Sequence, residues 1–141
     1  MPGFNGGMET LTIRKTLVIA AHALVGWALC FATIGIGFAV TTKENALIVH
    51  AIGAPIYFAV ISFVYFKRFG YTRPLPTAVA FTAIVMVVDF VVVGLVILRN
   101  LEMFTSPIGT WIPFALIFLS TWLTGVVLTW RAPHAIGAEP A

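Results

Sequence analysis

Asp89 is a carboxylate inside a long apolar run, flanked by Val87, Val88, Phe90 and Val91. A charged Asp at the centre of a transmembrane helix costs on the order of 2.5–3.5 kcal/mol, so it needs a partner, a water-filled cavity or a proton that neutralises it. Such an acid can bind a cation, carry a proton or hold a substrate. The alternative is a neutral or paired Asp that only holds helices together, and the sequence leaves both interpretations open.

Three more polar side chains lie at nearby depths. Counting 1.5 Å per residue from the centre of each apolar run places Asp89 roughly 5 Å and His50 roughly 9 Å to the same side of the midplane. Tyr57 and Thr33 lie close to this level. We therefore predict an intramembrane polar site of Asp89, His50, Tyr57 and Thr33, although depth alone leaves open whether Asp89 and His50 face each other.

A second polar position lies toward the opposite side of the midplane. His22 lies there at a depth of roughly 10 Å, with Ser62 and Thr124 at its level. It is either a hydrogen-bonded structural histidine or a ligand-binding or proton-relay group. Because His22 and His50 are separated by roughly 20 Å along the membrane normal, they cannot both ligate one haem iron. No sequence cluster supplies the about four ligands of a zinc site, so we expect no metal and no cofactor.

Four apolar segments must position these residues. The chain has 141 residues, 60% of them hydrophobic and 9% charged, whereas an average soluble domain is roughly a quarter charged. Its mean hydropathy is +1.04. Charges and prolines divide the sequence into spans of about 16–42, 46–66, 76–98 and 107–130, each long enough for the about 20 residues that a helix needs to cross a bilayer.

The predicted fold is an all-α membrane protein, a four-transmembrane-helix antiparallel bundle in a single domain, residues 14–131. We expect residues 1–13 and 132–141 to be flexible, since they are polar or rich in Gly and Pro. A shift of 56 residues aligns Ile52 and Gly53 with Ile108 and Gly109. This similarity would make the halves two parallel-repeat helical hairpins, and chance agreement in a restricted alphabet is the alternative.

The basic residues between the spans predict the orientation. One membrane face receives six of them, namely Arg14, Lys15, Lys67, Arg68, Arg73 and Arg131. The other face receives Lys43 and Arg99. By the positive-inside rule, both termini and the loop at 67–73 are predicted to be cytoplasmic, in a multi-pass protein of the plasma membrane. The charges form no stripe with aromatic residues, so we expect a lipid bilayer and not a nucleic acid as partner.

Small residues predict how the first span packs. Gly26, Cys30, Thr33 and Gly37 recur at spacings of three and four residues along one helix face. Such faces let helix backbones approach closely, within one chain or in a dimer. Cys30, the single cysteine of the chain, is interpreted as a small buried residue of this face.

Two functional hypotheses remain open. The first is a small transport or channel-type protein, a homo-oligomer that uses Asp89 and His50 as its intramembrane site. The second is a non-catalytic accessory or assembly subunit of a larger membrane complex. An enzyme is not favoured, because the sequence has no HExxH or GxSxG motif, no Cys nucleophile with a nearby His, and only short hydrophilic loops.

Overall fold

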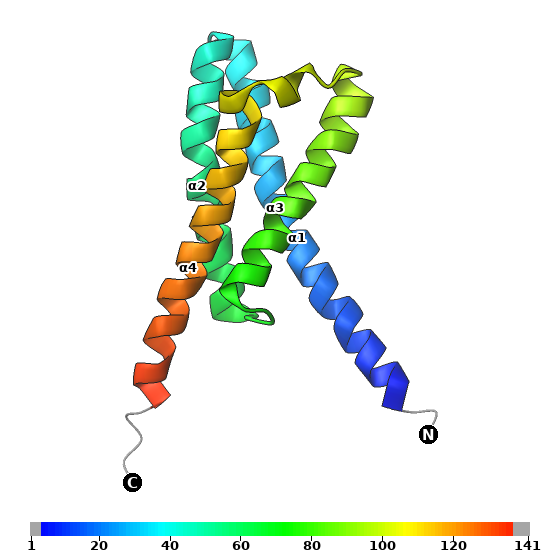
Figure 1. Ribbon diagram of the computed structural model, residues 1–141, viewed down its shortest axis with the longest axis vertical. Helices are drawn as coiled ribbons and strands as arrows, with labels where there is room; N and C mark the ends of the chain where they lie inside the picture. Colours follow the sequence, from blue (N-terminus) through cyan, green and yellow to red (C-terminus); the bar gives the residue numbers. More distant parts are fainter. Residues whose placement is uncertain (1–3, 137–141) are drawn as a thin grey trace.

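The computed structural model describes residues 4–136, with side chains described for residues 10–131. Helices make up nearly all of this range, and it contains no strand. The elements are α1 (Phe4–Val40), α2 (Lys43–Arg68), α3 (Pro74–Val88), η1 (Asp89–Leu98), η2 (Glu102–Thr105), η3 (Pro107–Trp111) and α4 (Ile112–Ile136), shown in Figure 1. The segments η1 and η3 are π-helical and η2 is a short 3-10 helix. Because η1 continues α3 and η3 leads into α4, the chain forms four long rods.

All four rods are long and apolar enough to cross a membrane, over residues 10–40, 43–68, 74–98 and 107–131. This confirms the four predicted spans of a multi-pass membrane protein. Of the ends that were predicted to be flexible, residues 4–13 belong to α1 and residues 132–136 to α4. No proline interrupts residues 4–40, so the first helix continues beyond its apolar segment. Residues 1–3 and 137–141, also predicted flexible, lie outside the described residues.

Local chemistry determines where several rods begin and end. Thr42 is extended, with φ −74° and ψ 156°, and its side chain accepts a 3.3 Å hydrogen bond from the backbone N–H of Asn45, which caps α2. Ser106 caps η3 in the same way, through a 3.1 Å bond from the N–H of Gly109. Arg99 ends η1 in the left-handed region, with φ 53°.

The rods place their connections at two ends of the molecule. Residues 41–42 and 99–106 lie at one end, here called the turn end (Figure 1). Residues 69–73 and both ends of the described chain lie at the other, the terminal end (Figure 1). At the turn end η1 diverges from α2 and α4, and η2 spans the distance between them (Figure 1). At the terminal end the first half of α1 diverges from the other rods (Figure 1).

The core lies between these ends, where all four rods meet. Phe58, Tyr65 and Phe81 are fully buried, and Val85 and Ile117 nearly so. The Phe81 ring lies 6.2 Å from that of Phe58 and 5.6 Å from that of Tyr65, both edge to face. These aromatic contacts join α2 to α3, while α4 packs against both helices.

The small-residue face of α1 lies against α2. A Cβ atom on Gly26 would lie 2.7 Å from Cε2 of Phe58, and one on Gly37 would lie 2.7 Å from Cβ of Ala46. Cys30, between the two glycines, is 5% exposed. The face therefore packs within the chain.

The similarity at a shift of 56 residues does not correspond to equal positions in the helices. Gly53 lies ten residues after the start of α2 at Lys43, whereas Gly109 lies two residues after the start of η3 at Pro107. The two hairpins also have different connections, since two residues separate α1 from α2 while η2 lies between η1 and η3. These differences favour chance agreement over a structural repeat.

Candidate functional site

A cavity of about 570 Å³ lies toward the turn end. Parts of α1, α2, η1, η2 and η3 line it, together with residues of α3 and α4 near the core. Its lining is mainly apolar and aromatic, with polar groups from Lys43, Asn100, Glu102 and Ser106 beside the connecting segments. Small-molecule sites in proteins have volumes of roughly 300–1,000 Å³ and a largely apolar lining with a few placed polar groups. The cavity fits that description.

Asp89 lies on the cavity wall at the junction of α3 and η1, where the hydrogen bonding of the helix changes from α to π. One carboxyl oxygen, Oδ1, accepts a 2.7 Å hydrogen bond from the indole Nε1 of Trp27 on α1. In the described part of the chain, the other oxygen has no hydrogen-bond donor. Trp27 is held in place by stacking on Phe31, with ring centroids 5.3 Å apart. Asp89 therefore has one fixed contact and one oxygen free for a ligand.

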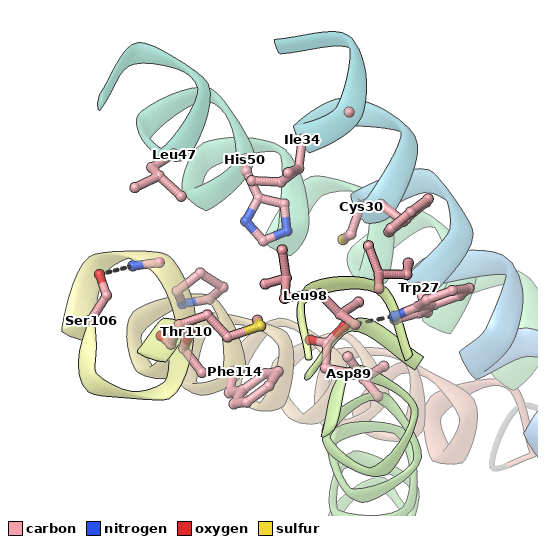
Figure 2. A pocket seen from close by; sticks show the side chains of 18 of the residues that line it. Trp27, Cys30, Ile34, Leu47, His50, Asp89, Leu98, Ser106, Thr110 and Phe114 are labelled. Atoms are coloured by element: carbon pink, nitrogen blue, oxygen red, sulfur yellow. Dashed lines mark hydrogen bonds between the residues drawn. The ribbon is translucent and has the colours of Figure 1, made fainter. Parts of the chain in front are cut away.

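His50 lies on α2 and also lines the cavity. Its Nδ1 atom is buried and has no hydrogen-bond partner among the described residues. A buried donor or acceptor without a partner costs about 1–3 kcal/mol. In Figure 2 the His50 ring and the Asp89 carboxyl point into the same space from opposite sides, and the described side chains form no hydrogen bond between them. The structure thus brings the two ionisable residues to one cavity without pairing them.

Thr33 and Tyr57, predicted at the same level, pair with each other and lie outside this lining. The Thr33 hydroxyl donates to the carbonyl of Leu29 at 2.8 Å. The Tyr57 hydroxyl lies 2.8 Å from the Thr33 oxygen, and because the Thr33 proton is already used, Tyr57 is the donor. This pair links α1 to α2 and leaves both hydroxyls satisfied without a ligand.

The residues of the second predicted polar position, His22, Ser62 and Thr124, form no common hydrogen-bonded cluster among the described side chains. His22 Nδ1 lies 2.7 Å from the carbonyl of Val18, and its ring packs edge-on against Tyr65 and Phe69 at 5.5 and 5.3 Å. Ser62 Oγ is buried without a partner, and the described side chains form no hydrogen bond from Thr124 to His22. These contacts favour a structural histidine in an aromatic cluster.

A chain of hydroxyls beside this cluster fixes the loop at the terminal end. Tyr65 and Thr72 share a 2.9 Å hydrogen bond, and Thr72 and Thr77 share one of 2.5 Å. Thr77 donates to the carbonyl of Arg73 at 2.8 Å, so the loop at 69–73 is tied to both helices that it connects. All the hydroxyls of this chain have partners, and we interpret the cluster as structural.

Sequence reasoning did not find Trp27 or the wall formed by η2. The signal for Trp27 was available, because an indole N–H in an apolar span needs an acceptor and Asp89 is a carboxylate at a similar depth. No local sequence pattern indicated that η2 forms part of the cavity wall. It depends on Gly94, where a Cβ would lie 3.1 Å from Leu101 and 3.3 Å from Phe104, so the connecting segment packs directly on η1.

The donor set limits the chemistry of the cavity. Within residues 10–131, no group of three His, Cys, Asp or Glu side chains is placed to hold a metal ion. Asp89 and His50 provide one carboxylate and one imidazole, which can bind a cationic or hydrogen-bonding ligand and can exchange protons with it.

Comparisons of the chain with models of protein families, with curated proteins and with solved structures found no match.

Proposed function

We propose that this chain is a small transport or channel-type membrane protein that binds a small ligand in the cavity between Asp89 and His50. One observation carries the proposal: two side chains with unused hydrogen-bonding capacity line the same cavity inside otherwise apolar spans. Ionisable residues at membrane depth are costly and are typical of ion, proton and substrate pathways. A purely structural Asp89 would have no need of a cavity of about 570 Å³ beside it.

The proposed topology is an antiparallel bundle in the plasma membrane with both termini in the cytoplasm. Two observations support it: the six-to-two division of basic residues and the position of residues 4 and 136, the two ends of the described chain, at the same end of the molecule (Figure 1). The cavity then opens toward the non-cytoplasmic side. Single cysteines at Thr72 and Asn100, in a Cys30→Ser background, test this with an impermeant thiol reagent on intact cells. Labelling at position 72 instead of position 100 would reverse the orientation.

A homo-oligomer is the proposed assembly, because one bundle of four helices leaves little room for a path across the whole membrane. The diverging first half of α1 offers a contact surface, with Leu11, Ile13 and Leu17 each more than half exposed. The same surface also favours the second candidate function, an accessory subunit that packs against another protein of a membrane complex. Native mass spectrometry from lipid nanodiscs distinguishes the two by the number of copies and by any other bound chain.

The central experiment measures the melting temperature of the protein in nanodiscs between pH 5 and 8, with sodium or with a bulky organic cation as the only salt cation. A site that binds a cation or proton makes stability depend on these conditions. Asp89→Asn keeps the size of the side chain and should remove the dependence of the melting temperature on the cation. Thr33→Val breaks the pair outside the cavity and is the matched control, because it should lower stability without changing the dependence. A wild-type protein insensitive to both variables would favour the accessory-subunit hypothesis.

A further inference from the structure

We infer that the ligand of the cavity is an organic monocation, a protonated amine or quaternary ammonium attached to an apolar body. The inference rests on the proposed function, since it names the substrate class of the same site. Three features of the cavity support it: its charge, the character of its walls and its access route.

The charge of the cavity excludes most other ligands. Asp89 is an acid in the middle of an apolar span, and its second carboxyl oxygen has no protein donor in the described chain. Trp27 and Cys30 of α1 line the cavity with it. An anion would lie against this carboxylate, and a neutral apolar ligand would leave it unpaired, which is costly in an apolar site. A cation pairs with it directly.

The walls favour an organic cation over an inorganic one. Sodium, calcium and similar hard cations require several oxygen ligands, whereas the residues around Asp89 include Trp27, Phe31 and Val85. Aromatic faces attract ammonium groups through cation–π interactions, most strongly when water is excluded. The volume of about 570 Å³ also exceeds what a bare ion needs and accommodates an apolar body of drug size.

The access route fits an amphipathic molecule. η1 packs on α3 and on the connecting segment at 99–106. The cavity is lined by α1 on one side and by Ile97 and Leu98 of η1 on another. Phe31 and Phe38 of α1 line the cavity and remain 41% and 51% exposed. The cavity is therefore open to the side between α1 and η1, where lipid tails would lie, as well as toward the polar residues of the connecting segments. An amphipathic cation in the bilayer can reach Asp89 through this side opening.

His50 makes binding of the cation compete with protons. Its ring faces the same cavity as Asp89 (Figure 2), so a proton on His50 places a positive charge beside the bound cation, and a proton on Asp89 removes its counter-ion. The other ionisable side chains that line the cavity are Cys30 on α1, Lys43 on α2 and Glu102 on η2. Lys43 and Glu102 have opposite charges and are both exposed, so water and salt screen their effects on the cation. Uptake of a proton should therefore release the ligand.

The test compares three molecules of similar shape on the full chain in nanodiscs by isothermal titration calorimetry. Benzyltrimethylammonium is the cation, neopentylbenzene is its neutral analogue with carbon in place of nitrogen, and phenylacetate is an anion. Benzyltrimethylammonium should bind saturably, and the other two should not. Asp89→Asn should weaken its binding by at least about thirtyfold, because removing one partner of a buried charge contact is costly. Thr33→Val, outside the lining, should bind it as the wild type does.

A second measurement needs no variant of Asp89. The Kd of wild-type protein for benzyltrimethylammonium should rise as the pH falls from 8 to 5, the range in which an ordinary histidine titrates. His50→Gln should flatten this pH profile. Equal binding of neopentylbenzene, or unchanged binding in a folded Asp89→Asn protein, would overturn the inference. If none of the three molecules binds but sodium- or pH-dependent stability persists, the inference fails and the proposed function stands. If that dependence is absent too, both fail.

Discussion

Replacing Gly26 with Ala tests whether α1 and α2 are in direct contact at the centre of the bundle. The new Cβ would lie 2.7 and 2.9 Å from Cε2 and Cε1 of Phe58, well inside an ordinary van der Waals contact. The Phe58 ring is fully buried and lies against Phe81, so it has no free space into which to rotate. Either the helices must separate or the ring must leave its preferred conformation.

Gly35 on the same helix provides the matched control, because a Cβ there meets no atom within 4 Å. Exchanging Gly for Ala inside a helix stabilises it by about 0.5–1 kcal/mol, and this contribution is common to both positions. The difference between Gly26→Ala and Gly35→Ala therefore isolates the overpacking cost, which is about 1–3 kcal/mol for one extra carbon in a packed core. We expect Gly35→Ala to be as stable as the wild type or more so, and Gly26→Ala to be less stable than Gly35→Ala by that amount.

The assay is reversible unfolding in mixed detergent micelles, followed by circular dichroism, with both variants measured at one protein concentration. Equal unfolding free energies for the two variants would show that Gly26 does not contact α2, and would refute the packing of the first two helices. A change of oligomer size only in Gly26→Ala would instead assign this face to a contact between subunits.

Three further substitutions test other contacts. Thr42→Ala should lower the unfolding free energy by about 0.5–2 kcal/mol, because it removes the hydroxyl that caps α2. Thr42→Ser keeps the hydroxyl and should not lower it. An equal loss of unfolding free energy in both variants would show that the hydroxyl is not the cap. Arg99→Gly should raise the melting temperature, because glycine relieves a left-handed backbone conformation that costs on the order of 1 kcal/mol. Arg99→Ala should not raise it. A higher melting temperature for Arg99→Ala than for Arg99→Gly would show that residue 99 is not in the left-handed region. Trp27→Phe should lower the unfolding free energy by about 1–3 kcal/mol, because it removes the hydrogen-bond donor to Asp89. In an Asp89→Ala background the same substitution should lower it much less. Equal losses in the two backgrounds would mean that the two side chains do not interact.

The four spans could be predicted from the sequence because apolar length and flanking charges are local properties. Their ends were less predictable. Residues 4–13 continue α1 beyond the predicted span, because helical hydrogen bonding extends outward from a stable span. The change to π-helical bonding at Asp89 and the position of η2 depend on contacts between segments, such as those of Phe104 with Gly94, which no local pattern encodes.

The candidate site was predicted in part. The free-energy cost of a carboxylate in an apolar run identified Asp89, and depth identified His50. Depth does not specify how each helix is rotated about its axis, and that rotation decides which side chains meet. The rotation of α2 places Tyr57 against Thr33 and not in the cavity lining. The contact of Trp27 with Asp89 depends on the same rotation, in this case of α1.

The two-residue connection between α1 and α2 has a consequence for biogenesis. Closing so short a loop costs little chain entropy, so these helices can associate in the bilayer while the rest of the chain is still being synthesised. The cavity needs residues from Trp27 to Ile117, so it can form only when the fourth span has entered the membrane. A nascent chain that ends after Arg68 would thus contain a paired hairpin in which His50 has no Asp89 opposite it. A nascent chain that ends after Leu98 would contain Asp89 but would still lack η3 and α4, which complete the walls of the cavity.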